Sequence, residues 1–249
     1  MLIKEFRIIL PFTVDEYNVA QLWCVAEVSK NETGGGEGIE VLINEPFDDE
    51  HYTPETPLNA CGQRFSTGQY THKCYHLSQK VPAYVRVLAP RGALEVEERA
   101  WNAYPYCRTI IENPSYMKDK FFLKIESMYI QDKLDEENIH DLPPELLEKR
   151  EVVYLDFVNH PLYSKSDYDP ECDPKTFHST KTGRGPLVRP EWWKQEQRIF
   201  QNFHRQMFCW MDKWYGYSMA DIREIEEQVK HELNQQRQTG ELRGMKATD

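Results

Sequence analysis

Cys107 is the side chain whose type and surroundings first suggest reactive chemistry, because it follows an aromatic segment and precedes Arg108. A cysteine nucleophile needs a neighbouring base or another group that lowers its pKa. No His–Asp partner can be assigned to Cys107 from the sequence. His76, His160 and Asp156 could be combined with a serine into a triad, but no Gly-x-Ser-x-Gly elbow accompanies them. The sequence therefore favours a buried or ligand-facing thiol over a catalytic one.

A glycine-rich segment at residues 31–38, NETGGGEG, has the composition of a phosphate-binding loop. Such a loop needs a helix after the glycines, so that backbone amides and the helix dipole face the anion. Here the next residues, 39–44, alternate like a strand. A turn between two elements is therefore the favoured interpretation.

A basic loop at residues 181–186 follows Ser179 and Thr180. It is either a structured turn with exposed charges or a regulatory site. Phosphate added to Ser179 would change the local charge sharply, so Ser179 is the candidate phosphorylation site.

The cysteine pattern argues against a metal site. None of the six cysteines forms a CxxC pair, and no metal or cofactor is expected. They stand at Cys24, Cys61, Cys74, Cys107, Cys172 and Cys209. The first twelve residues lack a long apolar segment, so no secretory signal is expected. We therefore expect a cytoplasmic protein with reduced thiols.

Composition restricts the class of partner. The chain has 249 residues, a formal net charge of -11 and 40% hydrophobic residues, enough for a sizeable core. An acidic chain is a poor candidate for nucleic-acid binding, which needs clustered Lys and Arg. No apolar run approaches the ~18 residues of a spanning helix. Any membrane contact should be local, apolar and transient.

The elements that must position these residues begin with a strand at residues 4–10 and a helix at residues 14–29. Thr13 and Glu16 form a capping box before this helix. Period-two alternation predicts the remaining strands. These are residues 39–44, 68–77, 94–99, 107–112, 121–130 and 151–158.

The C-terminal part changes to helical periodicity. Apolar residues recur every three or four positions from Ile199 to Trp214, which predicts an amphipathic helix. Ser218 and Asp221 cap a second, charged helix. Residues 48–67, rich in prolines and acids, read as a surface loop, and residues 161–190 as irregular. The order predicts an α+β fold with an antiparallel sheet in one domain, residues 1–249, with a tail at 241–249.

Several motifs in order along the chain resemble those of the phosphatidylinositol transfer proteins, and they cover nearly its whole length. The most specific is WNAYPY at residues 101–106. The others are KEFRIILP at 4–11, VDEY at 14–17, QL at 21–22, NETGGGEG at 31–38, GQYTHK at 68–73, KTGRGPL at 181–187, NFHRQ at 202–206 and FCW at 208–210. With Cys107 at this position, the chain resembles the small soluble class of this family.

The resemblance implies a START-like helix-grip fold, in which a curved antiparallel sheet and long helices enclose a lipid. It implies an inositol-binding set and a second set in contact with the phosphate or lipid. The first set is Thr71, Lys73, Asn102 and Glu227, and the second is Gln21, Thr109, Ser127 and Cys107. Thr and Asn donate and accept hydrogen bonds, Lys donates and Glu accepts, which suits a ring of hydroxyls.

Residues 81–88 are apolar between polar flanks. The pattern alone slightly favours core packing over a mobile lid. The resemblance instead implies a lipid-exchange lid. Its residues would be Val81, Pro82, Tyr84, Val85, Val87 and Leu88.

The chain departs from the family after Gln195, where about 35 family residues have no counterpart. By resemblance, the missing stretch would hold one strand of the sheet, a lysine that contacts the lipid phosphate and an aromatic pair that docks on membranes. Trp192 and Trp193 match an upstream tryptophan and are not assigned that role. We expect weaker lipid transfer and a less stable fold than in a relative with this segment.

The resemblance therefore implies a non-catalytic, monomeric carrier of one phosphatidylinositol or phosphatidylcholine molecule, which touches membranes transiently. Two alternatives remain open. One is a shortened isoform with impaired lipid transfer that acts as a regulatory or binding protein. The other is a lipid hydrolase, which would need a nucleophile that the residues do not indicate.

Overall fold

A computed structural model of the chain describes residues 2–78, 81, 89–90, 92–131, 136–159, 170–187 and 198–241. Contacts group the chain into two compact units. Unit 1 comprises residues 1–24 and 131–222, and unit 2 comprises residues 25–130 and 223–249. The assignment of residues 1–249 to a single domain stays a prediction. Within the described residues, no helix is long and apolar enough to cross a membrane.

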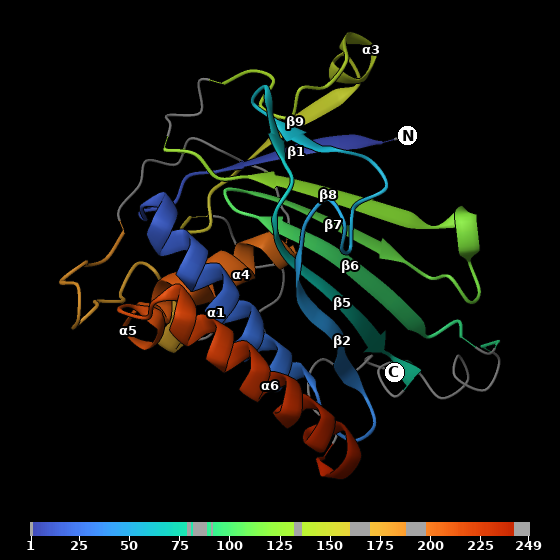
Figure 1. Cartoon of the computed structure of the whole chain (residues 1–249). Helices are drawn as coiled ribbons and strands as arrows, with labels where there is room; N and C mark the ends of the chain where they lie inside the picture. Colours follow the sequence, from blue (N-terminus) through green and yellow to red (C-terminus); the bar gives the residue numbers. More distant parts are fainter. Residues whose placement is uncertain are drawn as a thin grey trace. The chain divides into compact units, whose positions relative to one another are not determined.

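The described elements begin with a strand and a long helix, continue with a run of strands and end with helices (Figure 1). In chain order they are β1 (Ile3–Ile8), α1 (Val14–Glu32), β2 (Gly38–Phe47), β3 (Leu58–Ala60), β4 (Gln63–Phe65), β5 (Gly68–His76), β6 (Glu95–Ala103), β7 (Tyr106–Glu112), η2 (Lys118–Lys120), β8 (Phe122–Met128), α3 (Pro144–Leu147), β9 (Arg150–Leu155), η4 (Pro170–Cys172), α4 (Arg198–Cys209), α5 (Met211–Trp214) and α6 (Met219–Thr239). The mixed α+β class predicted from the sequence is confirmed.

Unit 2 is built on a five-stranded antiparallel sheet with the order β2-β5-β6-β7-β8 (Figure 1). The register shifts between Val41 and Ile43 where β2 pairs with β5. From β5 through β8 the strands pair without a shift. Side chains therefore keep their faces across these four strands, since alternation has a period of two.

In unit 1, β1 and β9 pair in parallel, with Ile3 opposite Arg150. The sequence predicted antiparallel pairing throughout, so this pair is a correction. Parallel strands need a long connection between them, and well over a hundred residues separate β1 from β9. Among the described residues, β8 pairs only with β7 and so forms one edge of the larger sheet.

Residues 48–67 are only in part the surface loop that their composition predicted. β3 and β4 form a short hairpin, and Leu58 and Ala60 are fully buried. They belong to a core cluster with Phe47, Tyr70, Trp101, Ala103 and Tyr106. Arg108 holds the segment in place, donating to the carbonyl oxygens of Thr56 at 2.8 Å and Pro57 at 3.0 Å. Three-residue strands are too short to give a recognisable alternation, which is why the sequence did not reveal them.

The glycine-rich segment is a turn that joins α1 to β2, as the sequence favoured. Thr33 is buried, donates to the carbonyl oxygen of Ser29 at 2.8 Å and accepts from the amide of Ile39 at 2.9 Å. Gly38 has a φ of 104°, and a Cβ at this position would lie 2.5 Å from Thr33. The glycine is therefore required by close packing, without any phosphate.

Unit 1 holds the amphipathic C-terminal segment, which the sequence predicted as one helix from Ile199 to Trp214. The structure divides it into α4 and α5, with Trp210 between them. Met207, Phe208, Met211 and Trp214 are all buried. The apolar periodicity continues across the break, so the pattern alone could not locate it.

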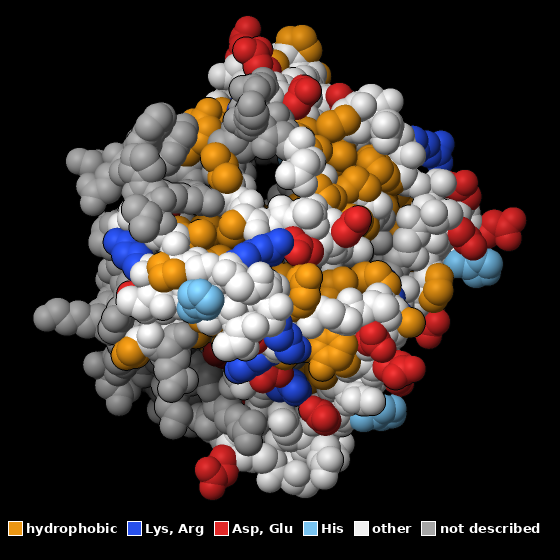
Figure 2. All heavy atoms as spheres, turned by 90° about the vertical axis from the view of Figure 1, so that its left-hand side faces the viewer, with side chains coloured by type: hydrophobic (Ala, Val, Ile, Leu, Met, Phe, Trp, Pro, Cys, Tyr) orange, Lys and Arg blue, Asp and Glu red, His pale blue; other side chains and the backbone are white. Residues whose placement is uncertain are grey.

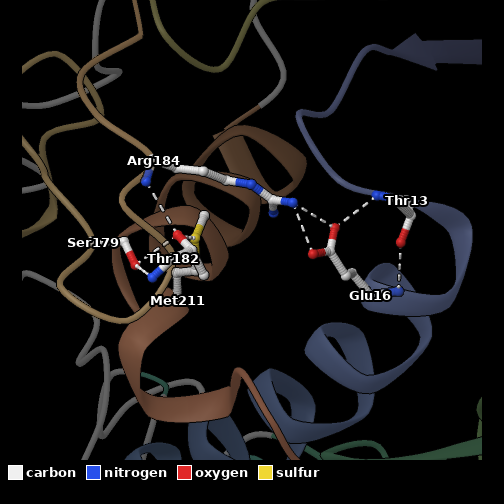
Figure 3. A network of polar contacts seen from close by, with 6 residues as sticks. All are labelled: Thr13, Glu16, Ser179, Thr182, Arg184 and Met211. Atoms are coloured by element: carbon white, nitrogen blue, oxygen red, sulfur yellow. Dashed lines mark hydrogen bonds and ion pairs between the residues drawn. The ribbon is translucent and has the colours of Figure 1, made fainter.

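Two helix caps match the sequence. The amide of Glu16 donates to Thr13 Oγ1 at 3.2 Å, and the amide of Thr13 donates to Glu16 Oε2 at 2.9 Å (Figure 3). At the start of α6, the amide of Asp221 donates to Ser218 Oγ at 3.2 Å, and the amide of Ser218 donates to Asp221 Oδ2 at 2.7 Å. Both predicted capping residues are confirmed.

His204 is a buried histidine on α4 with two polar partners. Its Nδ1 lies 2.6 Å from the carbonyl oxygen of Phe200, so Nδ1 carries the proton. The hydroxyl of Tyr17 therefore donates to Nε2, at 3.2 Å. Burial lowers the pKa of His204 from 6.5 to about 4.

This lowered pKa predicts a loss of stability in acid. Between pH 6.5 and about 4 the unfolded chain binds a proton at this position and the folded chain does not. The contribution is complete above pH 6.5 and falls by up to about 3 kcal/mol as the pH drops towards 4. Urea unfolding across this range should show a shallower pH dependence for His204→Gln than for the parent chain.

His231→Gln is the matched control, because the His231 side chain is exposed on α6. It should leave the pH dependence of the unfolding free energy unchanged. An equal pH slope for His204→Gln and the parent chain would contradict the assignment.

Candidate functional site

Six of the predicted site residues lie on one face of the five-stranded sheet. The register pairs Asn102 with Cys107 and Cys107 with Ser127 across β6, β7 and β8. In the next row, Thr71 pairs with Ala100, and Ala100 pairs with Thr109. Lys73 lies two positions beyond Thr71 and so faces the same way. The sequence predicted these residues singly, and strand pairing brings them together.

Helix α6 lies over this same face of the sheet. Asn44 is opposite Thr71 in the register, and its Nδ2 donates to Glu226 Oε2 on α6 at 3.3 Å. Ile39 of β2 packs in a cluster with Val229 and Leu233 of α6. The polar row is therefore on the helix-covered side, while the hairpin β3–β4 packs on the opposite side.

Lys73 is held by a mostly buried ion pair. Its Nζ lies 3.3 Å from Glu98 Oε1, and each side chain is 14% exposed. Tyr75 donates its hydroxyl to Glu98 Oε2 at 2.5 Å. Burial acts to raise the pKa of Glu98, but attraction to Lys73 and the two hydrogen bonds outweigh it and lower the pKa. Glu98 therefore stays ionised at neutral pH and holds the Lys73 side chain in one orientation.

Sequence reasoning did not identify Glu98 and Tyr75 as site residues. Lys73 and Glu98 are direct partners in the β5–β6 register. The sequence did contain one signal for this pair. Antiparallel pairing of the predicted strands 68–77 and 94–99 places a carboxylate opposite Lys73. The exact register was needed to select Glu98 from among Glu95, Glu97 and Glu98.

Asn102 has an open hydrogen-bonding position. Its Oδ1 is buried and has no partner among the described residues. A buried amide oxygen without a donor is costly. On a face lined by polar side chains, this oxygen could accept from a ligand hydroxyl.

The Cys107 thiol is buried beside Thr109, with 4.0 Å between Sγ and Oγ1. Burial raises the pKa of Cys107 to about 11. The thiol is therefore protonated at neutral pH, which supports a packing or ligand-facing role over nucleophilic chemistry.

The other triad candidates have partners of their own. His76 Nε2 lies 2.9 Å from Glu40 Oε2. Asp156 accepts from the amide of Val158 at 3.0 Å and from Asn159 Nδ2 at 2.9 Å. His160 lies outside the described residues.

The structure shifts the predicted glutamate on α6 by one position. Glu227 is 59% exposed and lies 3.2 Å from the exposed His231. The neighbouring Glu226 is 15% exposed and contacts both Arg223, at 2.6 Å, and Asn44 of the sheet. Glu226, not Glu227, is the carboxylate that meets the polar face.

Two further parts of the predicted site are only partly described. Gln21 lies in the part of α1 that belongs to unit 1 and is half-buried. Val81 is half-buried, and the other predicted lid residues lie outside the described residues. These are Pro82, Tyr84, Val85, Val87 and Leu88. Their roles stay predictions.

Ser179 is fully buried in unit 1 and is part of a polar network (Figure 3). Its hydroxyl donates to Asp212 and accepts from the amide of Thr182 at 3.0 Å. Thr180 also donates to Asp212, through its amide at 2.8 Å and its hydroxyl at 2.7 Å. Phosphate at Ser179 would face the Asp212 carboxylate, so modification requires this turn to open. Phosphorylation of Ser179 stays a prediction.

The basic loop beside Ser179 is tied to helix α1. Arg184 Nη2 lies 2.8 Å from Glu16 Oε1 and 3.0 Å from Glu16 Oε2 (Figure 3). Burial acts to raise the pKa of Glu16, but the contacts with Arg184 and Thr13 outweigh it and lower the pKa. The sequence left residues 181–186 as either a structured turn or a regulatory site. Their geometry is that of a structured turn.

The face drawn in Figure 2 has no broad basic surface. Lys and Arg side chains lie there in small separate groups, with acidic side chains spread among hydrophobic and neutral ones. No group of three His, Cys, Asp or Glu side chains within the described part of the chain could hold a metal ion.

Known proteins resemble this chain over nearly its whole length. The family model for phosphatidylinositol transfer protein matches residues 1–198 and 193–231. The beta isoforms of phosphatidylinositol transfer protein from Mus musculus and Homo sapiens are each 45% identical to it, over 100% of this chain and 99% of the relative. Phosphatidylinositol transfer protein 1 of Dictyostelium discoideum is 38% identical, over 94% of each chain.

The matches also locate an interruption. The alignment with the mouse protein runs over 284 positions and this chain has 249 residues, which leaves about 35 positions without a counterpart. The two segments matched by the family model meet at residues 193–198, which agrees with the predicted departure after Gln195. Identity at this level over nearly the whole of both chains establishes that this chain belongs to the phosphatidylinositol transfer protein family.

Proposed function

We propose that this chain binds one phosphatidylinositol or phosphatidylcholine molecule and transfers it between membranes without making or breaking a bond. Family membership supports phospholipid transfer. The observation that carries the choice of ligand is the polar row on the α6-facing side of the sheet. It combines a charged lysine, hydroxyls, and an amide oxygen that still needs a donor.

The head group would be recognised by complementary hydrogen bonding. Lys73 donates, Thr71 and Asn102 donate and accept, and a glutamate on α6 accepts from ring hydroxyls. We assign this last role to Glu226, because it contacts the sheet through Asn44. Thr109 and Ser127 would contact the phosphate, and Cys107 the lipid.

Exchange of one lipid for another needs no catalytic group, because no bond is made or broken. Each buried methylene of an acyl chain is worth about 0.8 kcal/mol, so two chains need a comparably apolar enclosure in place of the bilayer. Exchange is near balance when one lipid enters as another leaves. The raised pKa of Cys107 supports a non-enzymatic role, because a neutral thiol is a poor nucleophile.

We further propose a monomeric cytoplasmic carrier that contacts membranes transiently. The second candidate function is a binding or regulatory protein that has lost lipid transfer. The shortened chain favours this alternative, because about 35 aligned positions of the mouse relative have no counterpart in it. Native mass spectrometry separates the two functions. A co-purified phospholipid supports the carrier, while an empty protein without vesicle transfer supports the alternative.

Lys73→Ala tests the head-group assignment. Loss of a charge-assisted hydrogen bond costs about 1.5–3 kcal/mol, or roughly 10- to 100-fold in affinity. Transfer of labelled phosphatidylinositol between vesicles should fall by about this factor, while phosphatidylcholine transfer changes little. Phosphatidylcholine transfer also reports whether the variant is folded. An equal loss for both lipids would refute a selective role of Lys73.

Glu226→Gln and Glu227→Gln form a matched pair on adjacent positions of α6. The first removes the carboxylate that meets the sheet, and the second removes one that is 59% exposed. We expect phosphatidylinositol transfer to fall about tenfold for Glu226→Gln and to stay unchanged for Glu227→Gln. If transfer falls for Glu227→Gln and not for Glu226→Gln, Glu227 is the glutamate that binds the head group.

Restoring the missing segment tests the effect of the interruption. We insert the stretch that the mouse relative carries at this position, and a Gly/Ser linker of equal length serves as control. The native segment should raise both the transfer rate and the melting temperature, because it adds a strand and a phosphate contact, while the linker should raise neither. Equal rates with and without the native segment would show that the interruption does not impair transfer.

A further inference from the structure

Two cysteines that are distant in sequence meet in unit 1. Cys172 is the last residue of η4, and Cys209 is the last residue of α4. η4 packs against α4, which brings Cys172 near Cys209, and both are thiols in this structure. Cys172 is half-buried and Cys209 is buried. Thiols on two packed segments can form a disulfide when their Cα atoms lie within about 7 Å of each other.

Neighbouring contacts hold the two sulfur atoms together. Arg205 lies one helical turn before Cys209 on the same side of α4, and its Nη2 is 3.5 Å from Asp173 Oδ1, the residue after Cys172. The rings of Phe177 and Phe208 also meet edge to face, with 5.4 Å between their centroids. Three adjacent contacts therefore join the same two segments, so the meeting of the thiols follows from the packing of η4 on α4.

We propose that Cys172 and Cys209 form an oxidant-sensitive thiol pair that closes into an intrachain disulfide. The chemical partner is a low-molecular-weight disulfide such as oxidised glutathione. Neither the sequence motifs nor the lipid site assigns a role to this pair. The inference does not rest on the proposed lipid-transfer function.

The reaction proceeds in two exchange steps. The Cys172 thiol loses a proton, and its sulfur attacks the small disulfide, breaking that S–S bond and releasing one small thiol. The Cys209 thiol then loses a proton, and its sulfur attacks Cys172 Sγ, forming the intrachain bond and releasing the second small thiol. The protein gives up two electrons and two protons, and the small disulfide takes them up as two thiols.

The order of attack follows from accessibility. Cys172 is half-buried and open to a small reagent, whereas Cys209 is enclosed. The neighbouring Cys172 thiol, together with burial, raises the pKa of Cys209, which disfavours Cys209 as the first nucleophile. Cys172 is thus the entry thiol and Cys209 the resolving thiol.

The disulfide would close a loop of chain that contains the interruption. Residues 193–198, where the two family matches meet, lie between Cys172 and Cys209. Cross-linking a loop of this length restricts the unfolded chain substantially. Oxidation should therefore raise the free energy of unfolding of the folded chain.

The test uses the full chain incubated with excess oxidised glutathione, and with reduced glutathione as reference. Peptide mapping without reductant should give one cross-linked peptide containing Cys172 and Cys209. Alkylation after unfolding should label two fewer cysteines than the six of the reduced chain. The melting temperature of the oxidised form should rise by roughly 5 °C or more.

Cys172→Ser should abolish both the cross-link and the shift in melting temperature. Cys61→Ser, at an exposed cysteine, is the matched control and should abolish neither. The test substitutes Cys172 because it is half-buried, whereas Cys209 is buried. If a Cys209→Ala variant fails to fold, Cys172→Ser still tests the cross-link. A stable mixed disulfide on Cys172, pairing of Cys172 with another cysteine, or six alkylated cysteines after oxidation would overturn the proposal.

Discussion

The candidate site depends on the unshifted pairing of four neighbouring strands. Between β5 and β8 each residue faces a fixed partner, so side chains two positions apart share a face. A slip of one residue in any pair would turn that strand's polar side chains to the opposite face of the sheet. The core cluster around Tyr70, Trp101 and Tyr106 fixes the register from the other side. Packing on one face thereby positions the chemistry on the other.

That arrangement places a charge under a helix, where it must be compensated. Lys73 is mostly buried, and an unpaired ammonium in that position would be costly. Glu98 supplies the opposite charge, and the Tyr75 hydroxyl satisfies the second carboxylate oxygen. The lysine is thus held in one orientation before any ligand arrives. Preorganisation of this kind reduces the ordering cost of binding.

The larger sheet has an exposed edge among the described residues. Among the described residues, β8 is an edge strand, and Phe122 and Leu123 near its start are exposed. Exposed apolar edges invite pairing with other chains. β1 and β9 form a separate two-stranded sheet in unit 1.

The sequence by itself determined the class of fold, most strands and both helix caps, because strand alternation and capping are local patterns. The six residues of the polar face were implied by the family resemblance of the motifs, not by a local pattern. The tertiary structure decided which partners those residues have. Adjacent helical residues point about 100° apart, so only packing selects Glu226 over Glu227. Similarly, Glu98 and Lys73 become a pair through strand register, and Leu58 becomes core through a hairpin too short to recognise. Cys172 and Cys209 meet because η4 packs on α4, a contact between distant segments that no local pattern encodes.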